Sequence, residues 1–140
     1  MKKIVSGFLL LLSASVYAAT YIWQDTTTHY AIYFDGGYAT MPFHGPSSVP
    51  SYGTSITNVE YAWSPYDNGN TNEFVQICYS EPYSSAIEYC NDISGSQTGN
   101  IQAYDGFNAK GTFWIRHTLT GGAYPVYSTA TDTVTVTYDY

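Results

Sequence analysis

The sequence predicts an all-β protein, an antiparallel two-sheet β-sandwich of the immunoglobulin-like or Greek-key type with about seven or eight short strands. Three observations favour this class. Apolar and polar residues alternate at every second position, and helical periodicity is almost absent. Turn residues separate the alternating runs. A proline-rich segment supplies the long connection that a Greek key needs between its sheets.

The expected strands are runs rich in β-branched and aromatic residues. In chain order, the first five cover residues 30–35, 56–63, 73–79, 86–90 and 97–104. The next, residues 112–117, sets Phe113 and Ile115 on the face opposite Trp114 and Arg116. Both faces are apolar enough to lie between neighbours, so we expect a central strand.

The last expected strand covers residues 133–138, where Val134, Val136 and Tyr138 share one face and threonines occupy the other. This pattern is typical of a strand with one buried face. Gly, Asn and Asp mark tight turns between the strands, at residues 35–37, 67–70, 94–96 and 121–122. Residues 41–53 carry three prolines, which donate no ladder hydrogen bond. We therefore expect no central strand there, but a long crossover.

Residues 1–18 have the pattern of a secretory signal peptide. Lys2 and Lys3 precede an apolar run, residues 4–12, that is too short to cross a bilayer as a helix. Small residues then suit cleavage after Ala18. We therefore expect one domain over residues 19–140, located in the periplasm or outside the cell.

Charge excludes two classes of partner. Cleavage leaves only Lys110 and Arg116 against eleven acidic residues, a formal net charge of −9. Nucleic-acid binding depends on Lys and Arg that neutralise phosphates, and anionic membranes attract polybasic segments, so neither partner is expected. The high hydrophobic content, 44%, with 11% charged residues, excludes a disordered chain.

Cys78 and Cys90 are the only cysteines. The segment between them is longer than in the Cys-x-x-Cys pattern of redox enzymes and zinc ribbons. In an oxidising compartment this spacing favours a structural disulfide. Closing so short a loop stabilises a fold by roughly 3 kcal/mol in the chain-entropy model.

No motif for catalysis or metal binding stands out. His29, His44 and His117 lack the spacing of a zinc site, and we expect His117 to be partly buried and the other two to lie on the surface. A Gly-x-Ser-x-Gly elbow is absent. Residues 67–73 offer oxygen ligands for calcium, but Gly69 occupies a ligand position. We predict no enzymatic activity, cofactor or metal, and the calcium reading is weak.

Tyrosine is the remaining signal, with sixteen residues in the chain. Its ring suits both half-buried strands and binding surfaces. A loop fixed by a disulfide loses less entropy on binding. We therefore select Tyr79, Glu81 and Tyr83 as a candidate recognition patch beside the two cysteines.

The order of these features resembles the periplasmic flagellar FlhE family over most of residues 21–138. The matching features, in order, are Trp23-Gln24, residues 57–63, residues 75–78, Cys90, Phe113-Trp114, Gly121-Gly122, Pro125 and residues 134–138. The resemblance implies a small exported β-sandwich, a non-enzymatic role in flagellar assembly, and a limit on proton leak through the flagellar export apparatus. This chain departs from the family pattern in the longer, acidic segment between its cysteines.

Three functions therefore follow from the sequence. The first is an interaction protein of the cell envelope that resembles the flagellar family and binds a basic or hydrophobic protein. The second is a carbohydrate-binding module in which Trp63, Tyr66 or Tyr83 stacks on sugar rings. The third is an inhibitor that inserts residues 79–89 into the active site of a basic hydrolase such as lysozyme.

Overall fold

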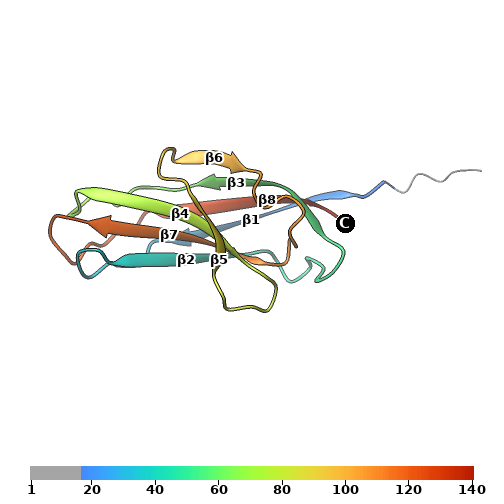
Figure 1. Ribbon diagram of the computed structural model, residues 1–140, viewed down its shortest axis with the longest axis horizontal. Helices are drawn as coiled ribbons and strands as arrows, with labels where there is room; N and C mark the ends of the chain where they lie inside the picture. Colours follow the sequence, from blue (N-terminus) through green and yellow to red (C-terminus); the bar gives the residue numbers. More distant parts are fainter. Residues whose placement is uncertain (1–16) are drawn as a thin grey trace, which may run out of the picture.

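The computed structural model describes residues 17–140, so nearly all of the predicted signal peptide lies outside the described residues. The described residues form eight antiparallel strands in two four-stranded sheets (Figure 1), which confirms the predicted all-β sandwich. The strands are β1 (Thr20–Thr28), β2 (Tyr38–His44), β3 (Ser55–Ala62), β4 (Asn72–Ser80), β5 (Glu88–Asp92), β6 (Thr98–Ile101), β7 (Thr112–Thr120) and β8 (Thr131–Asp139). Within this part of the chain, no helix could span a membrane.

The two sheets have the strand orders β1-β8-β3-β6 and β2-β7-β4-β5. Most consecutive strands lie in different sheets, and only β4 and β5 follow each other as neighbours. The edge strands β1 and β2 are linked across the sheets by side chains. Thr27 Oγ1 donates to the Pro42 carbonyl at 2.8 Å, and the backbone N–H of His44 donates to Asp25 at 2.8 Å.

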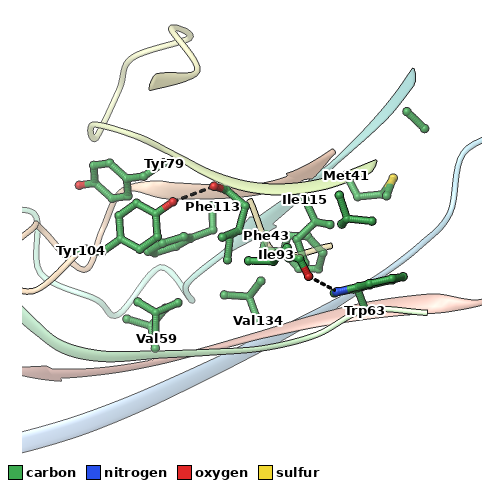
Figure 2. Packing of buried hydrophobic residues seen from close by; sticks show 14 of the residues in the cluster. Met41, Phe43, Val59, Trp63, Tyr79, Ile93, Tyr104, Phe113, Ile115 and Val134 are labelled. Carbon is green, nitrogen blue, oxygen red and sulfur yellow. Dashed lines mark hydrogen bonds between the residues drawn. The ribbon is translucent and has the colours of Figure 1, made fainter. Parts of the chain in front are cut away.

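The core lies between the sheets and follows the alternation of the strands. Phe113 and Ile115 of β7 and Val134 of β8 are fully buried, as the sequence pattern predicts. Buried polar tips are paired within this core (Figure 2). The indole N–H of Trp63 donates to the Ile93 carbonyl at 3.1 Å, and the Tyr104 hydroxyl donates to the Ile77 carbonyl at 2.8 Å.

Five expected strands match β3, β4, β5, β7 and β8 to within a few residues, and β6 is shorter than expected. The expected strand over residues 30–35 is wrong, because this segment is a loop with one isolated bridge between Ile32 and Val126. The sequence reading also missed β1, whose threonines resemble a low-complexity tract. Both errors have one cause: exposed aromatic and threonine residues carry little information about burial.

The proline-rich segment was also placed only in part. Residues 41–44 belong to β2, and the crossover begins after them. Pro42 is tolerated because β2 is an edge strand, so one side of its backbone needs no ladder partner. The prediction that this segment forms no central strand is confirmed.

Candidate functional site

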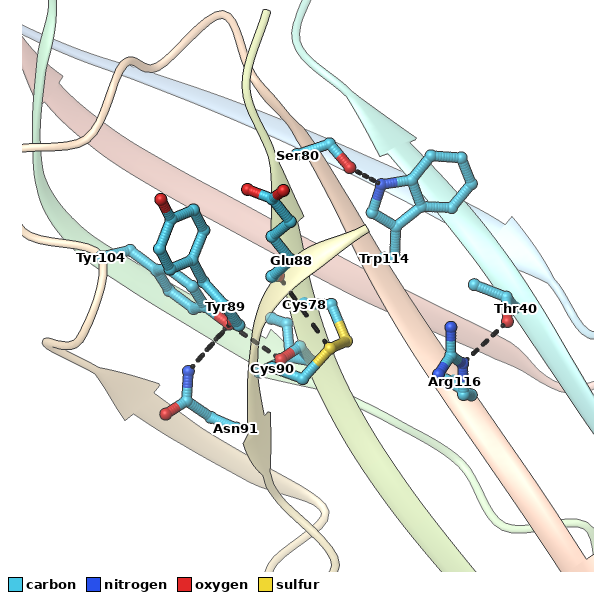
Figure 3. The surroundings of a disulfide bond; sticks show 11 residues. Thr40, Cys78, Ser80, Glu88, Tyr89, Cys90, Asn91, Tyr104, Trp114 and Arg116 are labelled. Carbon is cyan, nitrogen blue, oxygen red and sulfur yellow. Dashed lines mark hydrogen bonds between the residues drawn. A yellow bond between two sulfur atoms is a disulfide. The ribbon is translucent and has the colours of Figure 1, made fainter. Parts of the chain in front are cut away.

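The predicted disulfide between Cys78 and Cys90 is present and joins β4 to the short strand β5. Figure 3 shows it on the outer face of the β2-β7-β4-β5 sheet. Close by on the same face, the Trp114 indole donates to Ser80 Oγ at 2.8 Å. The disulfide therefore holds the edge strand and the start of the 81–87 loop against the sheet.

The three residues of the predicted recognition patch are separated by burial. Tyr79 is fully buried, and its hydroxyl oxygen lies 2.9 Å from the Asn108 carbonyl oxygen and 3.3 Å from Glu81 Oε2. Burial, followed by the nearby Glu81 carboxylate, raises the pKa of Tyr79. Glu81 and Tyr83 are exposed, and Tyr83 lies within 2.7 Å of Ser51 Oγ through its hydroxyl. The structure thus places Tyr79 in the core, and only Glu81 and Tyr83 are accessible.

A second group of side chains was not expected from the sequence. Four titratable residues meet between the two sheets and form a continuous hydrogen-bonded chain. His29 Nε2 lies 2.8 Å from Asp132 Oδ1, and His117 Nε2 lies 2.8 Å from Asp132 Oδ2. His117 Nδ1 lies 2.5 Å from Glu73 Oε1. We call His29, Glu73, His117 and Asp132 the buried network.

The elements around the buried network fix each of its members. His29 follows β1, and its Nδ1 lies 3.1 Å from Ser128 Oγ. Asp132 accepts a further hydrogen bond from the backbone N–H of Ser64 at 3.0 Å, and Glu73 accepts one from the N–H of Tyr66 at 3.1 Å. Segments that are far apart in the sequence are therefore joined by hydrogen bonds to one group of titratable side chains.

The hydrogen bonds to two carboxylates favour a positive charge on His117. An ionised carboxylate only accepts hydrogen bonds, so a ring between two carboxylates donates from both nitrogens and carries a positive charge. Burial opposes this charge, but the hydrogen bonds to Asp132 and Glu73 outweigh it and raise the pKa of His117. Burial likewise opposes ionisation of Asp132, but hydrogen bonds from His117 and His29 lower its pKa.

The network contains three donors that could hold a metal ion. Ligand atoms of His29, His117 and Asp132 lie within 4.8 Å of one another, and all three residues are buried. Each of these donor atoms already has a hydrogen-bond partner within the network. A metal would have to replace the shared protons, so the arrangement is better suited to pairing charges than to binding an ion.

The histidine predictions were partly correct. His44 is exposed, as expected, and His117 is fully buried where partial burial was expected. The prediction that His29 lies on the surface is wrong, because its ring stacks on Tyr66 with centroids 4.5 Å apart and only 6% of the residue is exposed. Tyr66, one of the rings considered for sugar stacking, is also buried.

The loops above the buried network carry a group of exposed rings. The connections 29–37, 63–71 and 121–130 all lie at one end of the sandwich, at the left of Figure 1. We call six exposed side chains there the aromatic end: Tyr30, Tyr33, Phe34, Tyr38, Phe74 and Tyr127. Between 43% and 66% of each of these residues is exposed. The 81–87 loop does not belong to this group.

Among the open hollows on the surface of residues 17–140, two have similar volumes. One, of about 460 Å³, lies on the outer face of the β1-β8-β3-β6 sheet and is lined mainly by short polar side chains. The other, of about 450 Å³, lies beside the aromatic end between Asp67 and Tyr127. Trp63 and Tyr66, two of the three rings considered for sugar stacking, are buried and face neither hollow.

Comparison with known proteins supports the fold. No protein-family model matches the chain, and no curated protein matches it. A crystal structure of FlhE is similar to it, with a TM-score of 0.68 and 17% sequence identity. The similarity covers 88% of this chain and the whole of that one. The chain therefore has a FlhE-like fold, as the resemblance read from the sequence implied.

Proposed function

We propose that this protein is an exported, non-enzymatic interaction protein of the cell envelope that acts with the flagellum. The observation that carries the proposal is the match of the complete FlhE structure to 88% of this chain. Some of the residues on which the sequence resemblance rests also lie in the core of the fold. Trp23 lies in β1, Phe113 in β7 and Val136 in β8, and all three are buried.

Two features support export. The Cys78–Cys90 disulfide is of a kind that persists in oxidising compartments and is rare in the cytosol. The leader-like residues 1–18 add a route out of the cytoplasm. Together they favour a periplasmic or secreted protein.

The buried network supports a role without catalysis. A catalytic acid or base must come within hydrogen-bond reach of its substrate. His29, His117 and Asp132 are buried and bond to one another or to the surrounding loops. Their burial and their bonds to one another favour a structural role over a catalytic one.

The finer role that we propose follows the family the sequence resembles. The protein would assist flagellar assembly and limit proton leak through the export apparatus. Deletion of the gene in its host tests this role by swarming and by cytoplasmic pH in acidic medium. We expect the deletion to impair swarming and to let the cytoplasmic pH fall, and we expect the wild-type chain to correct both defects. A deletion strain that swarms normally and holds its cytoplasmic pH would contradict the finer role.

The partner is tested directly by a pull-down with residues 19–140, disulfide intact, from a periplasmic and membrane extract of the host. Bound proteins are identified by mass spectrometry at low and high salt. Flagellar basal-body or export proteins are the expected result. Enrichment of one basic hydrolase would favour an inhibitor instead, and binding that needs added glycans would favour a carbohydrate-binding module.

A further inference from the structure

The aromatic end brings together exposed rings that come from separate segments of the chain. Tyr33 and Tyr127 come from different connections and pack edge to face with centroids 6.3 Å apart. Tyr38 of β2 and Phe74 of β4 lie on either side of Thr118, which belongs to the strand β7 between them. Grouped exposed aromatic side chains are typical of protein interfaces and of their strongest contacts.

Backbone hydrogen bonds hold the loops of the aromatic end in place. Ile32 and Val126 exchange two, at 3.0 and 2.7 Å. The Tyr66 hydroxyl bonds to the Tyr30 carbonyl, and the N–H of His29 donates to the Ala130 carbonyl at 3.0 Å. Rings on loops that are already ordered lose less conformational entropy when they bind a partner.

Negative charge lies beside these rings. Asp35 follows Phe34 directly, and Asp67 lines the hollow of about 450 Å³ next to Tyr127. The one cationic side chain nearby within the described residues is Arg116, which lies 5.1 Å from the centroid of the Tyr38 ring. The aromatic end therefore presents π faces and carboxylates together, and both attract cations.

We propose that the aromatic end binds a segment of a partner protein that carries Lys or Arg next to an apolar or aromatic side chain. The inference rests on the proposed interaction function and names its surface. The cation would lie over Tyr33 or Tyr127 and near Asp67, and the neighbouring apolar side chain would cover the exposed rings. Charge complementarity favours this occupant, because the mature chain is strongly acidic.

The test is an NMR titration of ¹⁵N-labelled residues 19–140 with a short synthetic peptide that carries Arg beside Trp. We expect chemical-shift changes confined to residues 29–38, 66–74 and 121–130. Two matched peptides, one with Glu for Arg and one with Ser for Trp, should bind about tenfold more weakly. Shifts centred on the 81–87 loop or on the outer face of the β1-β8-β3-β6 sheet, or equal binding of all three peptides, would overturn the proposal.

Variants sharpen the result. Tyr33→Ser with Tyr127→Ser should weaken the Arg-Trp peptide about tenfold, and Asp67→Asn should weaken it less. Tyr52→Ser with Tyr140→Ser removes two exposed rings elsewhere and should leave binding unchanged. Absence of binding by the wild-type chain would also reject the proposal. The pull-down is independent of this peptide, so captured flagellar proteins would keep the proposed function even if the aromatic end fails.

Discussion

His117 is the residue on which the buried network depends. Its ring joins β7 to β4 through Glu73 and to β8 through Asp132. Two carboxylates share the pocket, and the imidazolium charge offsets part of their repulsion. A buried charge is tolerated only when it is paired and hydrogen-bonded, so the network stabilises the fold only while its protonation states are kept.

The pKa directions predict a pH window for stability. The pKa of His117 is raised from 6.5, so its contribution is complete below about pH 6.5 and is lost as the pH rises through the folded-state pKa. The pKa of Asp132 is lowered from 3.8, so its contribution is present above that pH and is lost as the pH falls through the folded-state pKa. Urea unfolding at several pH values should therefore show a free energy of unfolding that falls as the pH rises from about 6 to about 9.

The chosen range avoids the buried tyrosines. Burial raises the pKa of Tyr104 to about 12, and it also raises those of Tyr66 and Tyr79. Their effects on stability therefore appear only above pH 10, where tyrosine ionises in the unfolded chain. His117→Gln should remove the slope between about pH 6 and 9. A variant with the wild-type slope would show that another group is responsible.

Asp132 tests the network without a change of pH. Asp132→Ala leaves His29 and His117 without their shared acceptor inside the core. Removing one partner of a buried ion pair costs about 3–5 kcal/mol, and we expect a loss of this size in the free energy of unfolding. Thr133→Ala, at a partly exposed neighbouring position, is the control and should change stability little. Equal losses in both variants would argue against a special role for the network.

Gly111 shows how a small residue makes room for a large one. A Cβ at this position would clash with the Tyr79 ring, which is fully buried and packs edge to face on Phe107 and Phe113. Gly111→Ala should therefore cost about 1–3 kcal/mol of unfolding free energy, as overpacking does elsewhere. Gly95→Ala is the matched control, because no atom lies within 4 Å of its added Cβ. If Tyr79→Leu does not reduce the cost of Gly111→Ala, the proposed clash is not its cause.

Single residues were harder to place from the sequence than strands. His117 continues the inward positions of β7, so its burial could be predicted, and Asp132 lies two residues before Val134 on the inward face of β8. The same alternation could have placed Asp132 in the core. His29 follows a strand that the threonine-rich pattern hid. Contacts that join residues about 100 positions apart leave no local spacing to read.

At the scale of elements, the disulfide compensates for a weak edge. Strand β5 pairs only with β4, its register shifts between Ile77 and Tyr79, and most of its residues are exposed. Such a strand gains little from burial. Its covalent link to β4 keeps the 81–87 loop anchored at both ends.

Removal of the disulfide should weaken this edge. Cys78→Ala with Cys90→Ala should lower the free energy of unfolding by roughly 3 kcal/mol, because the unfolded chain regains the entropy of a short closed loop. Chemical denaturation with and without reductant measures the same effect in the wild type. Reductant should leave the double variant unaffected. If reduction changes the wild type by much less, the edge is held by its hydrogen bonds.

The disulfide variant also tests the predicted recognition loop. If Glu81 and Tyr83 bind a partner, Tyr83→Ala and the double cysteine variant should both weaken capture in the pull-down while the fold survives. Far-UV circular dichroism checks the fold. Unchanged capture in both variants would exclude the 81–87 loop and leave the aromatic end as the candidate surface.

At the scale of the whole molecule, alternation and turns were enough to predict a two-sheet sandwich but not its strand order. The pairing of β1 with β8 brings residues such as Trp23 and Val136 side by side, and no local pattern encodes it. The strand order also decides which exposed rings lie close together, as at the aromatic end. The abundance of tyrosine in the sequence indicated a binding surface, and only the fold shows which rings lie together.

Net charge gives the last prediction, because it acts at the scale of the molecule. The full chain has four Lys and Arg against eleven Asp and Glu, and such an acidic protein attracts a basic partner over distances longer than any contact. Raising the salt concentration from about 50 to about 500 mM shortens the screening length and should slow association about tenfold or more. Dissociation should change far less, because the aromatic contacts are short-range. Stopped-flow fluorescence with the Arg-Trp peptide separates the two rates. If salt acted mainly on dissociation, close ion pairs rather than the overall field of the acidic protein would dominate binding.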